Sequence, residues 1–312
     1  MHHFSLFFLF FYFQFFTIQA QINYSENSVQ VKPIWKVGET YQYKFIDTDY
    51  VISVNDTVSK IVSKSTKNIN VLDENQFVYK LLWENKEVKT NDPDEFYNDY
   101  LTNSENLKYE YATNKEGEFL ELLNEDEVKN QMLSVAKKLK KKNKKDHVYQ
   151  SNILGLEEMI NSEDYVKYAF AQEINNLLQF NGLYMKIGEK YEGKQVQENL
   201  FGFPISSTST TWLDNINPQE ETYTIVTSQI LSKEDFESLW QLMAKAMLEK
   251  SNLNLTQEQV QKEISKYSNT IELSVDYKNK YNKNSILINS HYKFSLNIGT
   301  RKTVNQLEIE LM

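Results

Sequence analysis

Carboxylates are the side chains of this sequence whose crowding could support chemistry. Asp92, Asp94, Glu95 and Asp99 fall within one short stretch that also holds Pro93. Oxygen ligands at this density suit calcium, and two carboxylates facing each other can hydrolyse a glycosidic bond. The stretch lacks the glycine and the spacing of a helix–loop–helix calcium site, so a solvated acidic loop is the plainer interpretation. The sequence therefore predicts no metal ligand here.

Side chains for nucleophilic or redox catalysis are scarce. The chain has no cysteine and four histidines, His2, His3, His147 and His291. It contains no nucleophile-elbow, phosphate-loop, dinucleotide-binding or zinc-protease motif. We expect His147 in a surface loop and His291 on the solvated face of a strand. The prediction is a non-enzymatic protein with no catalytic residue and no cofactor, and carboxylate-based hydrolysis remains the catalytic alternative.

The sharpest charge feature is a run of lysines in an otherwise acidic chain. Its members are Lys137, Lys138, Lys140, Lys141, Lys142, Lys144 and Lys145, whereas the whole chain has a net charge of −9. The run is either a solvated helix end, which suits the helix dipole, or a contact for an anionic partner such as an envelope surface. No aromatic residue interleaves it, so a nucleic-acid partner is not expected.

A second candidate site is apolar. Trp240, Met243 and Met247 recur at helical spacing after the capping sequence that begins at Ser232. Methionine and tryptophan on one helix face can line an adaptable pocket for a lipid or another apolar ligand, or they can pack onto a sheet.

The elements that would position these residues are mostly strands. Alternating apolar residues predict strands around residues 38–45, 77–83, 108–122, 186–191, 208–213, 222–230 and 271–311. Helical spacing predicts helices from Asn124, from Ser162 to the Asn181–Gly182 cap, and from Ser232. Short connections favour antiparallel pairing, so the expected fold is α+β, with curved antiparallel sheet and helices packed on one face.

The first twenty residues have the layout of a secretory signal peptide. An apolar run from Phe4 to Phe16 is followed by Ala20 and then by polar chain. The run is shorter than the roughly 20 residues of a spanning helix. His2 and His3 replace the usual cations, which leaves a retained anchor as the alternative. We expect export to the periplasm or the extracellular space, with cleavage after Ala20.

The remaining chain divides into two parts, residues 21–183 and 184–312, which form two related half-units or one continuous domain. Lys36-Val37-Gly38-Glu39-Thr40-Tyr41 is echoed by Lys186-Ile187-Gly188-Glu189-Lys190-Tyr191. Each copy opens a β-rich stretch that leads into a capped helix. The echo is either a coincidence or the trace of a duplication.

The strand opening at Trp35–Glu39, the order of strands and helices and the leader loosely resemble the outer-membrane lipoprotein-carrier fold. They also resemble exported bacterial β-rich proteins of unassigned function that share this strand opening. The carrier resemblance implies a curved sheet closed by helices and an acyl or other apolar ligand. The sequence thus supports three hypotheses: an envelope protein that binds an amphipathic ligand between sheet and helices, a structural or adhesive protein, and a carboxylate-based hydrolase.

Overall fold

The structure is a computed structural model, and it describes residues 21–54, 56–162, 165–198, 204–230, 259, 271–298 and 300–312. Its strands are β1 (Ile22–Asn23), β2 (Ser28–Gln30), β3 (Thr40–Ser53), β4 (Asp56–Glu74), β5 (Val78–Thr90), β6 (Lys108–Asn114), β7 (Phe119–Leu122), β8 (Tyr184–Lys186), β9 (Lys190–Glu198), β10 (Pro204–Asn217), β11 (Thr222–Ile230), β12 (Ile271–Asn282), β13 (Leu287–Ile298) and β14 (Arg301–Leu311). Its helices are α1 (Glu95–Asn103), α2 (Glu125–Lys142), α3 (His147–Asn161) and α4 (Tyr165–Leu178).

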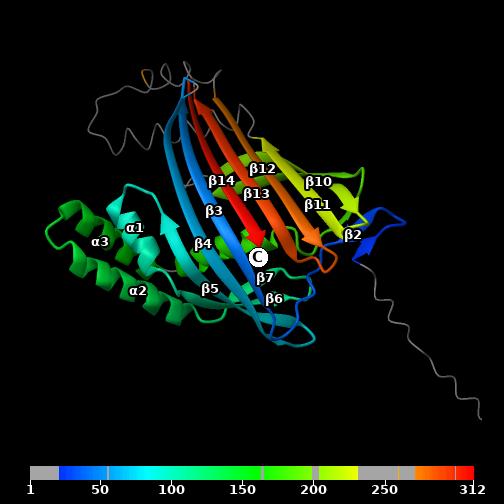
Figure 1. Cartoon of the computed structure of the whole chain (residues 1–312), viewed down its shortest axis with the longest axis horizontal. Coiled ribbons are helices and arrows are strands. Elements are labelled where there is room, and N and C mark those ends of the chain that lie inside the picture. Colours follow the sequence, from blue (N-terminus) through cyan, green and yellow to red (C-terminus); the bar gives the residue numbers. More distant parts are fainter. Residues whose placement is uncertain are drawn as a thin grey trace, which may run out of the picture.

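One large antiparallel sheet organises the molecule (Figure 1). Its strand order is β7-β6-β5-β4-β3-β14-β13-β12-β11-β10-β9. The last strand, β14, lies in the middle of the sheet between β3 and β13. A small sheet of β1, β2 and β8 joins the start of the described chain to the segment after α4. The expected α+β fold with curved antiparallel sheet is confirmed.

The inner face of the sheet is apolar because the strands alternate as the sequence predicts. Tyr43 and Phe45 of β3 are buried, whereas Gln42, which belongs to the opposite face of the same strand, is exposed. In β5 and β6 the same alternation buries Trp83 and Tyr109, whose rings stack with centroids 5.5 Å apart. Phe170 of α4 approaches the Tyr109 ring to 4.2 Å, so α4 is the helix that seals this part of the core.

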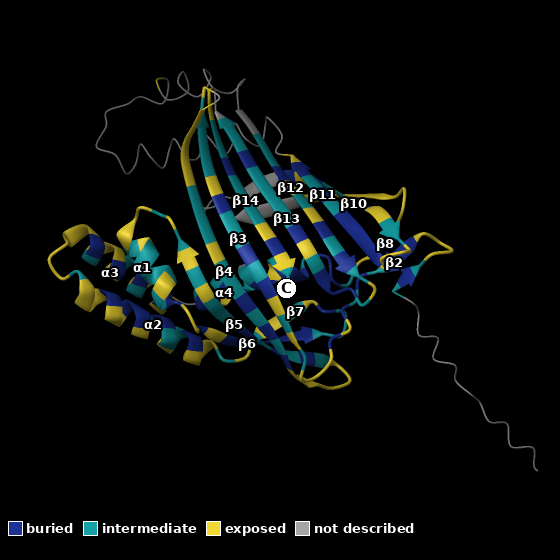
Figure 2. Ribbon diagram, in the orientation of Figure 1, coloured by how far each residue is buried: buried dark blue, intermediate teal, exposed yellow. Residues whose placement is uncertain are grey.

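The helices follow from their apolar spacing and their caps. In α4, Val166, Phe170, Ile174 and Leu177 recur on one face and are buried. In α2 the buried residues are Val128, Met132, Val135, Ala136 and Leu139. Figure 2 shows the resulting contrast, with buried and exposed residues alternating along α2 and α3.

Two local expectations need correction. His147 is not in a loop, because it begins α3; the Asp146 carboxylate caps this helix by accepting from the amides of Val148 and Tyr149. His147 is exposed, as expected. At the predicted start of α2, the Asn124 side chain makes no cap and instead accepts a hydrogen bond from the Glu110 amide of β6. The helix begins where expected, but tertiary contact replaces the capping box.

No helix in the described ranges is long and apolar enough to cross a membrane.

Candidate functional site

The main hollow of interest is a cleft of about 520 Å³ between the inner face of the sheet and helices α1 and α3. Small-molecule sites in proteins have volumes of roughly 300–1,000 Å³. The sheet side of the cleft consists of Asp47 and Asp49 from β3 and Ile61 and Ser63 from β4. We call this hollow the acidic cleft.

The facing wall comes from α1 with its preceding loop and from α3. Before and within α1 the lining residues are Asp92, Asp94, Phe96 and Tyr97. From α3 they are Ser151, Asn152, Gly155 and Met159, which recur along one side of that helix. The wall therefore combines carboxylates, aromatic rings and aliphatic surface.

The carboxylates of the sheet wall are held together by one amide. Asn305 of β14 donates through its side-chain nitrogen to Asp47 at 2.7 Å and to Asp49 at 2.9 Å. Burial raises the pKa of Asp47, the Asp49 charge raises it further, and the hydrogen bond from Asn305 opposes both. Bringing two carboxylates to one amide in a partly desolvated wall creates a site that favours a neutralising cation.

The carboxylates of the opposite wall are fixed by their own loop. One oxygen of Asp92 accepts from the Asp94 amide at 2.8 Å, and one oxygen of Asp94 accepts from the Tyr97 amide at 3.0 Å as the α1 cap. In the described part of the chain the second oxygen of each has no protein partner. Burial raises the pKa of Tyr97, and the charges of Asp47, Asp92 and Asp49 raise it further. The Tyr97 hydroxyl is therefore close enough to both walls for their negative charges to act on it.

The acidic stretch singled out from the sequence is thus divided between two tasks. Asp92 and Asp94 line the cleft, whereas Glu95 and Asp99 face α2. Lys142 is 2.6 Å from Asp99, and Asn143 donates to Glu95 at 2.8 Å. Tyr149 of α3 also donates to Asp99, at 2.7 Å. Glu95 and Asp99 therefore connect α1 to the other helices. The described residues contain no group of three or more His, Cys, Asp or Glu side chains that could hold a metal ion.

A buried ion pair outside the acidic cleft joins the sheet to α4. Lys67 of β4 pairs with Glu173 of α4, and its ammonium group lies 4.6 Å from the Phe45 ring centroid. Tyr109 donates to the other oxygen of Glu173 at 2.6 Å. Burial lowers the pKa of Lys67 to about 7, while the Asp47 charge favours the ammonium form. The ammonium group also lies 5.3 Å from the Trp83 ring centroid, so the ion pair is set among aromatic side chains of the core.

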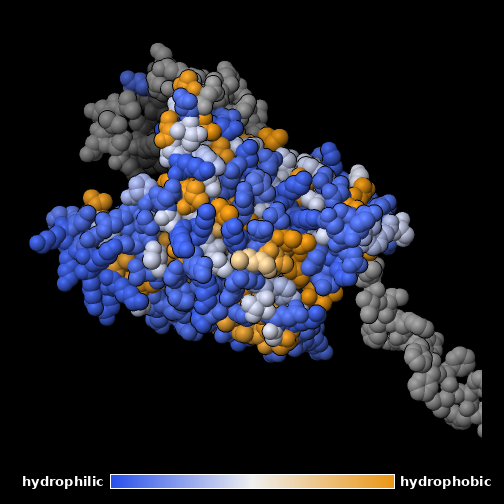
Figure 3. All heavy atoms as spheres, in the orientation of Figure 1, coloured by the Kyte–Doolittle hydropathy of each residue, from blue (hydrophilic) through white to orange (hydrophobic). Residues whose placement is uncertain are grey.

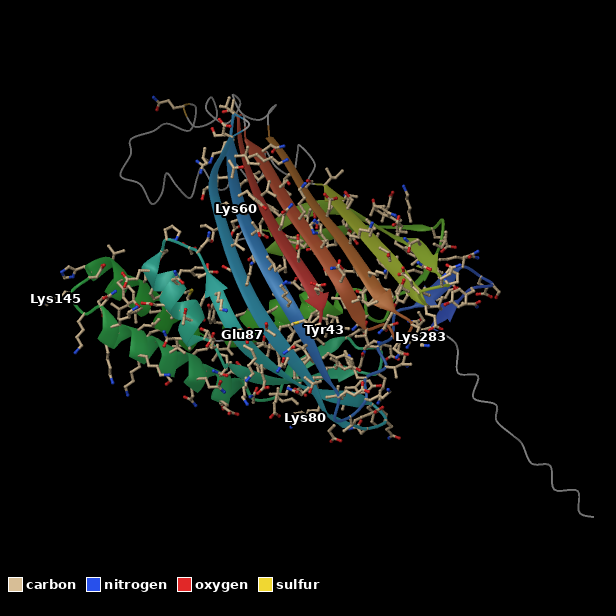
Figure 4. The ribbon with its side chains drawn as sticks, viewed as in Figure 1. Tyr43, Lys60, Lys80, Glu87, Lys145 and Lys283 are labelled. Carbon is tan, nitrogen blue, oxygen red and sulfur yellow. The ribbon has the colours of Figure 1, made fainter. Side chains whose placement is uncertain are left out.

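The other predicted site residues are placed as follows. Trp240, Met243 and Met247 lie outside the described residues. The lysine run ends α2 and forms the turn into α3, and all seven side chains are exposed. Lys140 pairs with Glu157 at 2.9 Å and Lys142 with Asp99. Lys145 lies at the far end of the helices in Figure 4. His291, on β13, has 44% of its side chain exposed.

Sequence reasoning missed Asp47, Asp49, Lys67 and Glu173. A signal for three of them was present. Along β3 the inward positions read Tyr43, Phe45, Asp47, Asp49, so an apolar face becomes acidic halfway along the strand. Along β4 the inward series of Ile69 and Val71 is preceded by Lys67. Charges on the inward side of a strand indicate a partner or a site.

Comparison with known proteins places the chain in no established family. No family model matches the sequence, and no curated protein matches it. Among solved structures, one described as lipid–protein interactions in lipovitellin aligns with a TM-score of 0.46 at 7% identity. The alignment covers 89% of this chain and 25% of the lipovitellin chain, so this chain spans about a quarter of that protein's length. A likeness at this level identifies neither a family nor a ligand.

Proposed function

We propose that this protein is a non-enzymatic binding protein whose ligand is an amphipathic organic cation held in the acidic cleft. The observation that carries the proposal is the lining of the cleft. Asp47 and Asp49 lie on one wall and Asp92 and Asp94 on the other, and Ile61 adds apolar surface to the sheet wall.

The charge of the lining selects the charge of the ligand. Among the described residues that line the cleft, four are aspartates and none carries a positive charge. A cation about 4 Å from one such carboxylate gains roughly 4 kcal/mol at the effective dielectric of a protein surface, before desolvation is subtracted. The rings of Phe96 and Tyr97 offer cation–π contacts to the same group.

The apolar lining selects an amphipathic rather than a purely ionic ligand. Phe96 and Met159 contribute hydrophobic surface opposite Ile61. Each methylene group of a ligand that is buried here adds about 0.8 kcal/mol. By contrast, the space left between Trp35, Ile69 and Leu177 beneath the sheet amounts to about 20 Å³, which is room for one water. A fatty chain would therefore use the cleft rather than this part of the core.

The experiment is calorimetric titration with a probe pair of equal chain length and opposite charge, octyltrimethylammonium and octanoate, both below micellar concentrations. We expect the cation to bind and the anion not to bind. Asp47→Asn combined with Asp92→Asn should weaken the cation about 10-fold or more, equivalent to about 1.4 kcal/mol.

The matched control is Asp214→Asn, which removes an exposed carboxylate of β10 outside the cleft. It should leave the affinity unchanged. Equal binding of both probes, or equal weakening by Asp214→Asn, would contradict the proposal. Failure of both probes to bind would contradict it too, and would favour the structural or adhesive alternative.

The apolar leader before Gln21 supports a further part of the proposal, namely export to the periplasm or the extracellular space. Peptide mapping of the protein from its natural cells should find Gln21 as the first residue. Recovery of peptides from residues 1–20 would instead indicate a retained anchor.

A second function, carboxylate-based glycoside hydrolysis, is favoured by one observation, the raised pKa of Asp47 across the cleft from Asp92 and Asp94. It ranks second because Asp92 and Asp94 each accept a backbone hydrogen bond that holds the loop in place. A panel of p-nitrophenyl glycosides tests it. Release of nitrophenol that is abolished by Asp47→Asn would replace the binding proposal.

A further inference from the structure

The end of the helical layer carries a cationic surface that the cleft does not use. It consists of Lys137, Lys138, Lys141, Lys144 and Lys145 with Val148, and we call it the lysine tip. All five lysines are exposed, and Val148 is 72% exposed. In Figure 4 the labelled Lys145 lies at the extremity of the helices, away from the sheet.

The tip differs from the other lysines of the run because no described acidic residue pairs with it. Lys140 and Lys142 are bound by Glu157 and Asp99. Within the described residues, none of the five tip lysines forms an ion pair. The run is therefore divided: two lysines stabilise the helices, and five offer unneutralised charge at one end of an acidic protein.

The fold holds the tip in a defined shape. Val135, Ala136 and Leu139 of α2 are buried, which fixes the side of the helix that carries lysines outward. Asp146 caps α3 immediately after Lys145 and fixes the turn. Figure 3 shows that the surface over α2 and α3 is almost entirely hydrophilic on this side.

We propose that the lysine tip docks the protein onto an anionic lipid bilayer. Lysine ammonium groups are compact and strongly hydrated, and they suit a diffuse layer of headgroup charge rather than bidentate recognition of one phosphate. Val148 adds an aliphatic side chain that can enter the headgroup region beside the lysines. The tip contains no aromatic residue on which bases could stack, which disfavours single-stranded nucleic acid. This proposal does not depend on the ligand of the cleft.

The test is co-sedimentation of the full chain with vesicles of phosphatidylcholine containing 30% phosphatidylglycerol, compared with pure phosphatidylcholine. We expect stronger binding to the anionic vesicles, and less of it in 0.5 M salt. Changing all five tip lysines to glutamine should lower the partition coefficient about 100-fold or more, because each lysine near such a surface contributes about 5-fold. Changing them to arginine should preserve binding.

The matched control changes five other exposed lysines to glutamine, with the same loss of charge: Lys64, Lys89, Lys186, Lys194 and Lys278. It should retain most of the binding. Equal loss in both glutamine variants, or binding of both lipid mixtures alike, would overturn the proposal. So would binding of soluble polyphosphate or RNA with an affinity equal to that for anionic vesicles. Thermal unfolding of each variant confirms that it is folded.

Discussion

At the scale of single residues, Lys67 is a charged side chain that the described part of the chain buries at a cost. Its side chain is 9% exposed, and its charge is balanced by Glu173 at the junction of sheet and α4. Removing one partner of such a pair leaves an unpaired charge, whereas removing both charges is often nearly neutral.

We therefore expect Lys67→Met to lower the free energy of unfolding by about 3 kcal/mol. The double variant Lys67→Met with Glu173→Gln should recover most of this loss, because the glutamine oxygen can still accept from Tyr109. Chemical denaturation of the three proteins measures the difference. A double variant as unstable as the single one would show that Lys67 acts mainly by packing against Phe45.

Two aspartates of the helix–sheet region should respond to pH in opposite ways. Burial alone would raise the pKa of Asp99, but hydrogen bonds from Lys142 and Tyr149 lower it. Because the folded pKa is depressed, Asp99 contributes stability above its unfolded pKa of about 3.9, and the contribution disappears as pH falls through the folded value. Asp47 has a raised pKa, so at neutral pH its ionisation costs stability.

We expect Asp99→Asn to destabilise the protein by about 1 kcal/mol at pH 7, with the difference from the parent shrinking below pH 4. Asp47→Asn should be equally stable or more stable than the parent at pH 7, with any gain also lost in acid. Unfolding curves between pH 3 and pH 7 check both. A difference for Asp99→Asn that grows as the pH falls would contradict the assigned direction.

At the scale of elements, the two copies of the sequence echo fold alike. In both, the glycine has φ of +86° (Gly38 and Gly188), and the following glutamate amide donates to the lysine carbonyl three residues earlier. In both, a tyrosine hydroxyl then donates to that glutamate, at 2.7 Å from Tyr41 and 2.9 Å from Tyr191. The six residues therefore encode one turn-to-strand unit, which is used at the start of β3 and of β9.

Gly117, in the β6–β7 hairpin, lies where the hairpin packs closely against Pro33 and Asn181. It has φ of +85°, and an added Cβ would lie 2.3 Å from Pro33 Cγ, whereas at Gly38 it would meet no atom within 4 Å. Gly38→Ala should therefore cost about 1 kcal/mol, the price of positive φ alone. Gly117→Ala should cost about 3 kcal/mol or more, because Pro33 and Asn181 must also move.

Thermal unfolding of both glycine variants provides the comparison. Equal losses would mean that the hairpin shifts freely and that the contact of Gly117 with Pro33 and Asn181 does not hold the N-terminal segment in place.

At the scale of the whole molecule, the sheet is joined at its centre by strands from opposite ends of the chain. β3 pairs with β14 from Tyr43 opposite Leu311 to Ser53 opposite Arg301. From one edge of the sheet to the other, the strands stand in the order β9 to β14 and then β3 to β7. Each of the two sets therefore follows the order of the chain, in the same sense across the sheet. In each set a longer segment follows the third strand, α1 in one and residues 231–270 in the other. This order agrees with a duplication, which stays a hypothesis.

Because β14 lies at the centre of the sheet, truncation of the C-terminus should affect folding. Removing residues 301–312 should abolish folding, because β3 and β13 would both lose their partner in the middle of the sheet. Removing Met312 alone should have little effect, since it follows the last strand. Circular dichroism and thermal unfolding of the two truncated proteins measure this. A cooperative transition in the shorter protein would show that β3–β7 and β9–β13 are stable apart.

Much of the fold could be predicted from local patterns. Alternation at Tyr41, Tyr43 and Phe45 identified β3, and the spacing of Val128, Met132 and Val135 identified α2, because burial of one face imposes a period on the sequence. α3 was missed because Lys144, Lys145 and Asp146 look like a loop, and only Asp146 as a cap gives the helix a start.

The acidic cleft could not be predicted, because its residues come from distant parts of the chain. Asp92 and Asp94 stood out as a cluster, but Asp47 and Asp49 join them only when β3 faces α1 across the cleft. The amide that holds Asp47 and Asp49 comes from Asn305, more than 250 positions away.

The sequence alone thus determined the periodic elements, the absence of cysteine chemistry and the lysine run, because these depend on residue type and local spacing. The tertiary structure decided which charges are neutralised and which remain free. Glu95 and Asp99 form ion pairs with Lys142, whereas Asp92 and Asp94 line the cleft. The five tip lysines form no ion pair with a described residue. Electrostatic interactions act through space, so their outcome depends on distances that only the folded chain sets.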